Sequence, residues 1–219
     1  MLLHLPVKCN FFLPILNTFI MIQFLKAIGI ILIIISILAV VMSYTLKQKT
    51  ERQNYRLVKT MQEIEIRFYP KAILATLKSP SETYTGNNNT NFRKLADYIF
   101  GSNQHSDKIS MTSPVHMEKN SDGSSMSFVM PSKYTMEELP KPNDKNIELH
   151  YSDEGYYAVV KFGGYANEKI ILNKETELKQ KLSELSLTHN NKFVYLGYNA
   201  PWDVINRENE VLVKIDFKE

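Results

Sequence analysis

The chain has 219 residues, of which 44% are hydrophobic and 22% charged, and this suits one folded domain with an additional segment. Two of its 26 basic residues, Lys8 and Lys26, lie in residues 1–46, which hold no acidic residue, so 24 basic and 23 acidic groups remain in the rest. This near balance argues against a nucleic-acid partner, which would need a clustered basic face. The single cysteine, Cys9, leaves the remaining chain without disulfide or thiolate chemistry.

Residues 27–46 form an uncharged run, AIGIILIIISILAVVMSYTL. At 1.5 Å per residue such a helix is about 30 Å long, which matches the hydrocarbon core of a bilayer. The run therefore predicts one transmembrane helix and a single-pass membrane localisation. A cleaved signal peptide is the main alternative, although the run is long for one and no small-x-small cleavage site follows it. We interpret residues 1–26 as an N-terminal lead that could be dispensable. The side of the membrane that holds the rest of the chain stays open.

Residues 47–60 are polar and lack apolar periodicity, which favours a tether, so the folded domain is expected to span residues 61–219. Its first strand is indicated by apolar residues at 64, 66 and 68 that alternate with charged ones, and residues 72–78 supply a second strand. A polar loop over 79–91 precedes a helix that Thr90 or Asn91 would cap and that Gly101 would end. The apolar face of this helix consists of Phe92, Leu95, Ala96 and Ile99.

Residues 108–115, which read KISMTSPV, have the alternation of a strand. Pro114 cannot donate to a strand ladder, so this central strand is expected to leave its sheet or become an edge there. A turn at 121–124 then leads into a further strand at 126–130.

The second half of the chain repeats this order at an offset of 83 residues. Residues 147–151 echo residues 64–68, residues 193–198 answer the central strand, and residues 211–215 answer 126–130. Between them a helix is expected whose stripe consists of Ile170, Ile171, Leu178, Leu182 and Leu185. Matching order and spacing predict a β-α-β duplication in an α+β fold, built either as a sandwich or as an open, curved barrel.

Several short motifs resemble the SOUL haem-binding family. They are KISMTSPV at 108–115, FVMPSKY at 128–134, LPKPND at 139–144, FGGYA at 162–166, and GYNAPW followed by NRENEV between 197 and 211. The resemblance covers about residues 63–217. It implies a duplicated β-α-β-β unit that forms a distorted antiparallel barrel flanked by two helices. It also implies non-covalent binding of haem or a related tetrapyrrole in a shallow apolar site.

The resemblance bears directly on how iron would be held. Some members of the family carry an axial histidine in the pattern Ile-Arg-His-Tyr, whereas this chain reads Ile66-Arg67-Phe68-Tyr69. Phe68 cannot ligate iron, so binding is expected to rest on apolar contact, and Phe68→His is expected to restore an axial bond. The five histidines (His4, His105, His116, His150 and His189) are more simply surface or strand residues than ligands, and no metal cluster is predicted.

Aromatic and apolar side chains are the remaining candidates for ligand contact. Phe92 either packs in the core or lines a site beneath the polar loop, and Trp202 either anchors its loop or stacks on a ligand. The candidate cofactor-binding residues are Phe68, Tyr69, Phe92, Ile99, Met111, Tyr198 and Trp202.

Two classes of function follow from the sequence. The first is a membrane-anchored domain that binds haem or a related tetrapyrrole for buffering or transfer. The second is a domain that uses the same scaffold to bind another amphipathic small molecule or a protein partner. An enzyme is not predicted, because no set of nucleophile, base and orienting residue can be named, and no catalytic residue is assigned.

Overall fold

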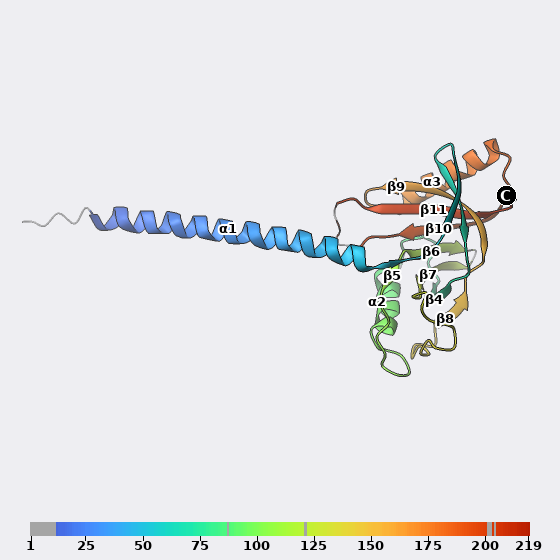
Figure 1. Ribbon diagram of the computed structural model, residues 1–219, viewed down its shortest axis with the longest axis horizontal. Helices are drawn as coiled ribbons and strands as arrows, with labels where there is room; N and C mark the ends of the chain where they lie inside the picture. The colour runs from blue at the N-terminus through green and yellow to red at the C-terminus, as the bar shows by residue number, and fades with distance from the viewer. Residues whose placement is uncertain (1–11, 87, 121, 201–202, 204) are drawn as a thin grey trace, which may run out of the picture. The chain divides into compact units, whose positions relative to one another are not determined.

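The computed structural model describes residues 12–86, 88–120, 122–200, 203 and 205–219 (Figure 1). The chain divides into two compact units, Met1–Lys49 and Thr50–Glu219. The first unit contains helix α1 (Phe12–Lys49). Within it, Ile20–Val41 is the one stretch of the described helices that is long and apolar enough to cross a membrane. This window begins before the predicted span of residues 27–46, because residues 20–25 are also uncharged and continue the same helix.

The second unit is an α+β fold built on a nine-stranded sheet. Its strand order is β2-β3-β9-β11-β10-β6-β7-β4-β8, and every neighbouring pair is antiparallel. The strands of the sheet are β2 (Arg56–Met61), β3 (Ile64–Tyr69), β4 (Ile73–Ser79), β6 (Val115–Asn120), β7 (Gly123–Val129), β8 (Ile147–Tyr151), β9 (Gly155–Gly163), β10 (His189–Gly197) and β11 (Glu208–Ile215). The end strands β2 and β8 do not pair with each other, so the sheet is open and does not close into the predicted barrel.

Side chains alternate between two faces of this sheet because successive residues of a strand point in opposite directions. One face packs against helices α2 (Asn88–Ile99) and α3 (Glu168–Glu184), and we call it the helix face. Its core includes Ile64, Ile66, Ala75, Leu95, Ile99, Ala158, Leu178, Leu182, Val211 and Val213. The opposite face has a smaller apolar cluster, made of Tyr69, Val159, Val194, Leu196 and Leu212. It also buries charged groups, Arg67 and Glu210 among them.

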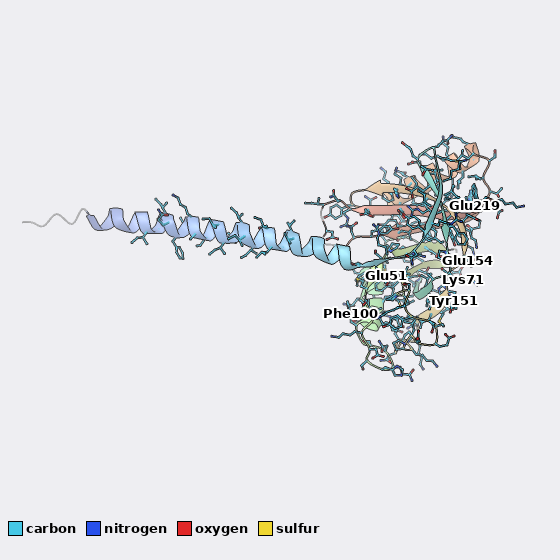
Figure 2. All side chains as sticks on the ribbon, in the orientation of Figure 1. Glu51, Lys71, Phe100, Tyr151, Glu154 and Glu219 are labelled. Atoms are coloured by element: carbon cyan, nitrogen blue, oxygen red, sulfur yellow. The ribbon has the colours of Figure 1, made fainter. Side chains whose placement is uncertain are left out.

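The predicted helices are present with small shifts in their bounds. The stripe of α3 is confirmed at Ile171, Leu178 and Leu182, which are fully buried, and the side chain of Asn167 caps the helix by accepting from the amide of Ile170. Helix α2 begins at Asn88, ahead of the expected caps at 90 or 91. Two other aromatic side chains are more than half exposed: Phe100, which follows α2, and Tyr151 in the edge strand β8 (Figure 2).

Two predicted segments are wrong in detail. KISMTSPV is not one strand: it contains β5 (Thr112–Ser113) and, after Pro114, only the first residue of the main-sheet strand β6, because a proline cannot donate to the ladder. The segment interpreted as a tether contains β1 (Glu51–Arg52), which pairs in parallel with β5, and β2. Strand β2 lies on the sheet edge and is mostly exposed, so it lacks the apolar alternation that would have identified it.

Candidate functional site

A cavity of about 550 Å³ opens where β9 and β10 end and β11 begins. We call it the Tyr198 cavity. It is lined by Arg52, Tyr55, Lys161, Phe162, Gly163, Tyr198, Arg207, Glu208, Asn209 and Glu210. This volume lies within the range of protein sites for drug-sized ligands, and aromatic walls with a few polar groups are typical of such sites.

Glu210, which lines the cavity, belongs to a buried ion pair with Arg67, and we call this pair the floor although Arg67 is not itself a lining residue. The guanidinium of Arg67 donates from Nη1 to Glu210 Oε2 at 2.9 Å and from Nη2 to Glu210 Oε1 at 2.8 Å. It also donates from Nε to Glu65 Oε2 at 2.7 Å. Burial alone would lower the pKa of Arg67, but the hydrogen bonds and charges of Glu210 and Tyr69 outweigh it and raise that pKa. Arg67 is therefore charged at all accessible pH values and holds Glu210 through two parallel hydrogen bonds.

Two tyrosines complete this floor. Tyr198 donates its hydroxyl hydrogen to Glu210 Oε2 at 2.7 Å, and the hydroxyl oxygen of Tyr69 accepts from Arg67 Nη1 at 2.8 Å. Burial raises the pKa of both phenols, and for Tyr198 the charge of Glu210 raises it further. Both phenols are therefore neutral, so each presents an aromatic ring with a polar end and neither is prepared as a phenolate ligand.

The first residues of the second unit form one wall, and we call residues 51–55 the strap. Arg52 donates to Glu208 Oε2 at 2.5 Å, and its guanidinium lies 4.5 Å from the ring centre of Tyr198. The ring of Tyr55 lies 4.0 Å from the guanidinium of Arg67 and 5.4 Å from the ring of Tyr69. Sequence reasoning missed these residues because it assigned them to a tether. The isolated Tyr55 in a polar segment is the signal that could have indicated a docked strand.

Arg207 gives the cavity an unused hydrogen-bond donor. Its Nη1 donates to the carbonyls of Ala200 at 3.1 Å and Asp203 at 2.6 Å. Its Nε is buried and has no hydrogen-bond partner among the described residues. A buried donor without a partner is costly, so this atom favours an anionic oxygen of a ligand. The other two cations that line the cavity already have carboxylate partners: Arg52 donates to Glu208, and Lys161 donates to Glu65 Oε1 at 2.5 Å.

The structure brings together two of the residues predicted for ligand binding, Tyr69 and Tyr198. Phe68 lies on the helix face, where its ring packs against Tyr156 at 5.3 Å, so it points away from the Tyr198 cavity. On α2, Phe92 packs against Phe128 at 5.1 Å, and Ile99 is 1% exposed in the core. Met111 is exposed outside the main sheet. Trp202 lies outside the described residues.

None of the described histidines lines this cavity. His116 is buried and bonds to Gln53 Oε1 through Nε2 at 2.7 Å, and burial lowers its pKa to about 4. His150 is bonded through Nε2 to Thr76 at 2.8 Å. The part of the chain that the structure describes has no group of three His, Cys, Asp or Glu residues that could hold a metal. The Tyr198 cavity offers aromatic walls and the unpartnered Nε of Arg207, which suit the ring and the carboxylates of a haem.

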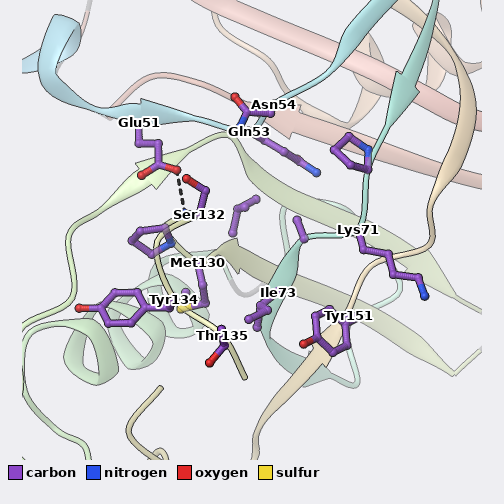
Figure 3. Close-up of a pocket in the computed structure, with 14 residues that line it drawn as sticks. Glu51, Gln53, Asn54, Lys71, Ile73, Met130, Ser132, Tyr134, Thr135 and Tyr151 are labelled. Carbon is purple, nitrogen blue, oxygen red and sulfur yellow. Dashed lines mark hydrogen bonds between the residues drawn. The ribbon is translucent and has the colours of Figure 1, made fainter. Parts of the chain in front are cut away.

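A second, smaller cavity of about 250 Å³ lies on the other side of the strap (Figure 3). Glu51, Gln53 and Asn54 line it together with Lys71, Ile73, Met130, Tyr134 and Tyr151. The amide of Ser132 donates to Glu51 Oε1 at 2.8 Å and ties the strap to this rim. The strap thus lines both cavities, with Arg52 and Tyr55 in one and Glu51 and Gln53 in the other.

The Tyr198 cavity gives this open antiparallel sheet a hollow of the size and aromatic lining that small-molecule sites have. The sequence profile of the SOUL heme-binding protein family matches residues 50–214. The chain belongs to that family, which supports non-covalent haem binding as predicted.

Among characterised proteins, the chain is 30% identical over 154 residues to Heme-binding protein 2 of Homo sapiens, covering 67% of this chain and 75% of that protein. It is 28% identical over 129 residues to Heme-binding protein 1 of Sus scrofa, covering 55% of this chain and 68% of that protein. The crystal structure of the EcmrR C-terminal domain superposes with a TM-score of 0.55 at 10% identity, over 75% of this chain and 99% of that domain. This last likeness concerns the fold alone.

Proposed function

We propose that this protein is anchored in a membrane by α1 and binds haem or a related tetrapyrrole in the Tyr198 cavity, for buffering or transfer. The observation that carries the proposal is the unpartnered Nε of Arg207 at a cavity lined by the aromatic residues Tyr55, Phe162 and Tyr198. An aromatic surface beside an unused cationic donor suits a flat apolar macrocycle that bears carboxylates.

Different residues of the chain would contact different parts of the tetrapyrrole. Tyr55 and Tyr198 would contact the macrocycle, and Arg207 would take a carboxylate with its free N–H. A bound haem would supply its iron and an extended aromatic surface, and the chain assigns no protein ligand to that iron at this cavity. Binding without a covalent link or an axial histidine leaves the ligand exchangeable, which suits buffering or transfer better than permanent storage.

The anchoring role rests on the composition and length of α1. Ile20–Val41 has a mean hydropathy of 2.9, and none of its strongest window is buried in the protein. An exposed apolar helix of this length is stable in lipid and poorly soluble in water. The same features occur in signal sequences near an N-terminus, so recovery of a mature protein that begins after residue 49 would replace the anchor with a cleaved signal.

The alternative function is binding of another amphipathic small molecule or of a protein partner. The smaller cavity favours the first of these, because about 250 Å³ is too little for a tetrapyrrole but enough for a compact ligand. Lys71 stands at its rim above the apolar residues Ile73 and Met130. The proposed role is binding in either case, and no residue is assigned to catalysis.

A haem titration of the full chain in detergent, followed by the Soret absorbance, tests the proposal. Arg207→Met should weaken haem binding about tenfold, or about 1.4 kcal/mol, since a charge-assisted hydrogen bond is lost. Lys78→Met is the matched control, because Lys78 is exposed on β4 and makes only a loose ion pair with Glu148 at 3.7 Å. Lys71→Met, at the smaller cavity, should leave haem binding unchanged. Haem binding in Arg207→Met as tight as in the parent would contradict the proposal.

We also propose that the sheet arose by duplication of a β-α-β-β unit. The sequence echo pairs β3 with β8, β4 with β9, β6 with β10 and β7 with β11. Exchanging each strand for its counterpart reverses the order β3-β9-β11-β10-β6-β7-β4-β8 and otherwise leaves it unchanged. Two copies of one unit related by a twofold axis would produce this arrangement, whereas β2 has no counterpart.

A further inference from the structure

Two loop tips beside the Tyr198 cavity expose large apolar side chains. Tyr165, in the loop after β9, is 58% exposed, and Ile205, in the loop between β10 and β11, is 69% exposed. Single exposed apolar residues are common, but these two belong to loops that meet at one edge of the cavity. The guanidinium of Arg207 joins the loops, because it lies 4.4 Å from the ring of Tyr165 and holds the carbonyls of Ala200 and Asp203.

The loop that carries Tyr165 is held by a buried amide. Asn209 is 3% exposed and donates from Nδ2 to the carbonyl of Gly164 at 2.8 Å. The hydroxyl of Tyr195 donates to Asn209 Oδ1 at 2.8 Å and fixes the orientation of that amide. Gly164 has a φ of +79°, which a side chain would disfavour. Tyr165 is therefore presented on a fixed turn.

The loop that carries Ile205 is also built around specific hydrogen bonds. The amide of Glu208 donates to Asn199 Oδ1 at 2.6 Å, and the amide of Ala200 donates to Asp203 Oδ2 at 3.2 Å. Together with the bonds of Arg207, these contacts connect the described residues on either side of Ile205.

The strap places the start of the second unit at this same edge. Arg52 bonds to Glu208, the neighbour of Arg207 in sequence, and stacks on Tyr198 at the opening of the cavity. Along the chain the strap begins two residues after α1 ends at Lys49. The edge that carries Tyr165 and Ile205 is thus the edge at which the chain enters the folded unit.

The geometry points to a lipid surface as the partner of Tyr165 and Ile205. Tyrosine favours the membrane–water interface because its ring is apolar and its hydroxyl stays hydrated, and an isoleucine enters the acyl boundary. Arg207 beneath Tyr165 adds a cation that anionic headgroups attract. This inference rests on the proposed membrane anchor. It adds that the folded unit itself contacts the bilayer, with the Tyr198 cavity opening beside the contact, so an apolar tetrapyrrole could enter from the lipid.

The test uses fluorescent labels on the full chain in vesicles of phosphatidylcholine and phosphatidylserine. In a Cys9→Ser background, Tyr165→Cys, Ile205→Cys and Glu154→Cys each receive one environment-sensitive fluorophore. Glu154 is exposed and directly precedes β9, whereas Tyr165 follows it, so the nine residues of β9 separate the two positions by about 30 Å. Figure 2 shows Glu154 at the surface of the folded unit. Quenching is measured with iodide in water and with a spin-labelled lipid.

Labels at 165 and 205 should emit at shorter wavelength, lose most of their iodide quenching and gain lipid quenching, while the label at 154 behaves as in water. Equal iodide quenching at all three positions would overturn the inference. Protection of 165 and 205 from both quenchers would also overturn it, because it would indicate a protein partner. Co-flotation of the full chain with vesicles and the haem titration test the anchor and the ligand separately, and both could succeed while the labels fail.

Discussion

Arg67 is the residue on which the floor of the cavity depends most. It is fully buried, and its charge is balanced by Glu210 and Glu65 through short hydrogen bonds. Buried ion pairs add little net stability when both partners are present, because desolvation of two charges offsets their attraction. Removing one partner lowers the stability of the fold, because the charge of the other partner then stays buried without a counter-charge.

Arg67→Leu should therefore lower the free energy of unfolding by about 3–5 kcal/mol, measured by urea denaturation of the full chain in detergent. The double variant Arg67→Leu/Glu210→Leu should recover part of this loss, because it removes the stranded carboxylate. Arg56→Leu is the matched control: its ion pair with Glu219 is exposed, so its loss should destabilise the fold far less than Arg67→Leu does. A double variant less stable than Arg67→Leu alone would contradict this account of the pair.

His116 makes the stability of the fold depend on pH. Burial lowers its pKa to about 4 in the folded chain, against about 6.5 when unfolded, so the unfolded chain binds more protons between these values. Stability should therefore fall as pH drops from 7 toward 4, with about 2 kcal/mol lost by pH 5 through this residue. The measurement compares unfolding of the parent and His116→Gln at pH 7 and pH 5. The variant should lose less stability than the parent on acidification, and an equal loss in both would show that His116 is not responsible.

At the scale of elements, the helices could be predicted and the strap could not. The faces of α2 and α3 follow from apolar residues spaced at three and four positions, a local signal that the buried Leu95, Leu178 and Leu182 confirm. Short strands such as β1 and β5 are set by partners more than 50 residues away in sequence, and no local pattern encodes such pairing. Pro114 indicated where KISMTSPV would leave its sheet. It did not indicate that Thr112 and Ser113 would pair with Glu51 and Arg52.

Because no local pattern encodes pairing between distant segments, the candidate site was predicted only in part. Tyr69 and Tyr198 were identified from an aromatic residue at a strand end and a motif in a loop, and the structure places both on the Arg67–Glu210 pair. Arg52 and Tyr55 were missed because their role depends on the strap docking against β3 and β11. Phe68 was assigned by position in a motif, whereas the alternation of β3 turns it to the helix face.

At the scale of the whole molecule, the two faces of the sheet differ in the space that they leave for a ligand. The helix face is filled by the main core, and Phe68 lies there among Tyr156 and the guanidinium of Arg56. The opposite face carries the Tyr198 cavity, which the strap helps to enclose. We propose that the tetrapyrrole occupies this cavity rather than a site beside Phe68.

Haem titration of Tyr55→His and Phe68→His, each in the full chain, distinguishes the Tyr198 cavity from a site beside Phe68. Tyr55 lines the Tyr198 cavity, so an imidazole there can reach the iron, and the Soret band should become sharper and shift to the red. In Phe68→His the imidazole points to the other face, so the haem spectrum should match that of the parent. The reverse pattern, a new axial bond in Phe68→His and none in Tyr55→His, would place the ligand on the helix side of β3 and contradict the account.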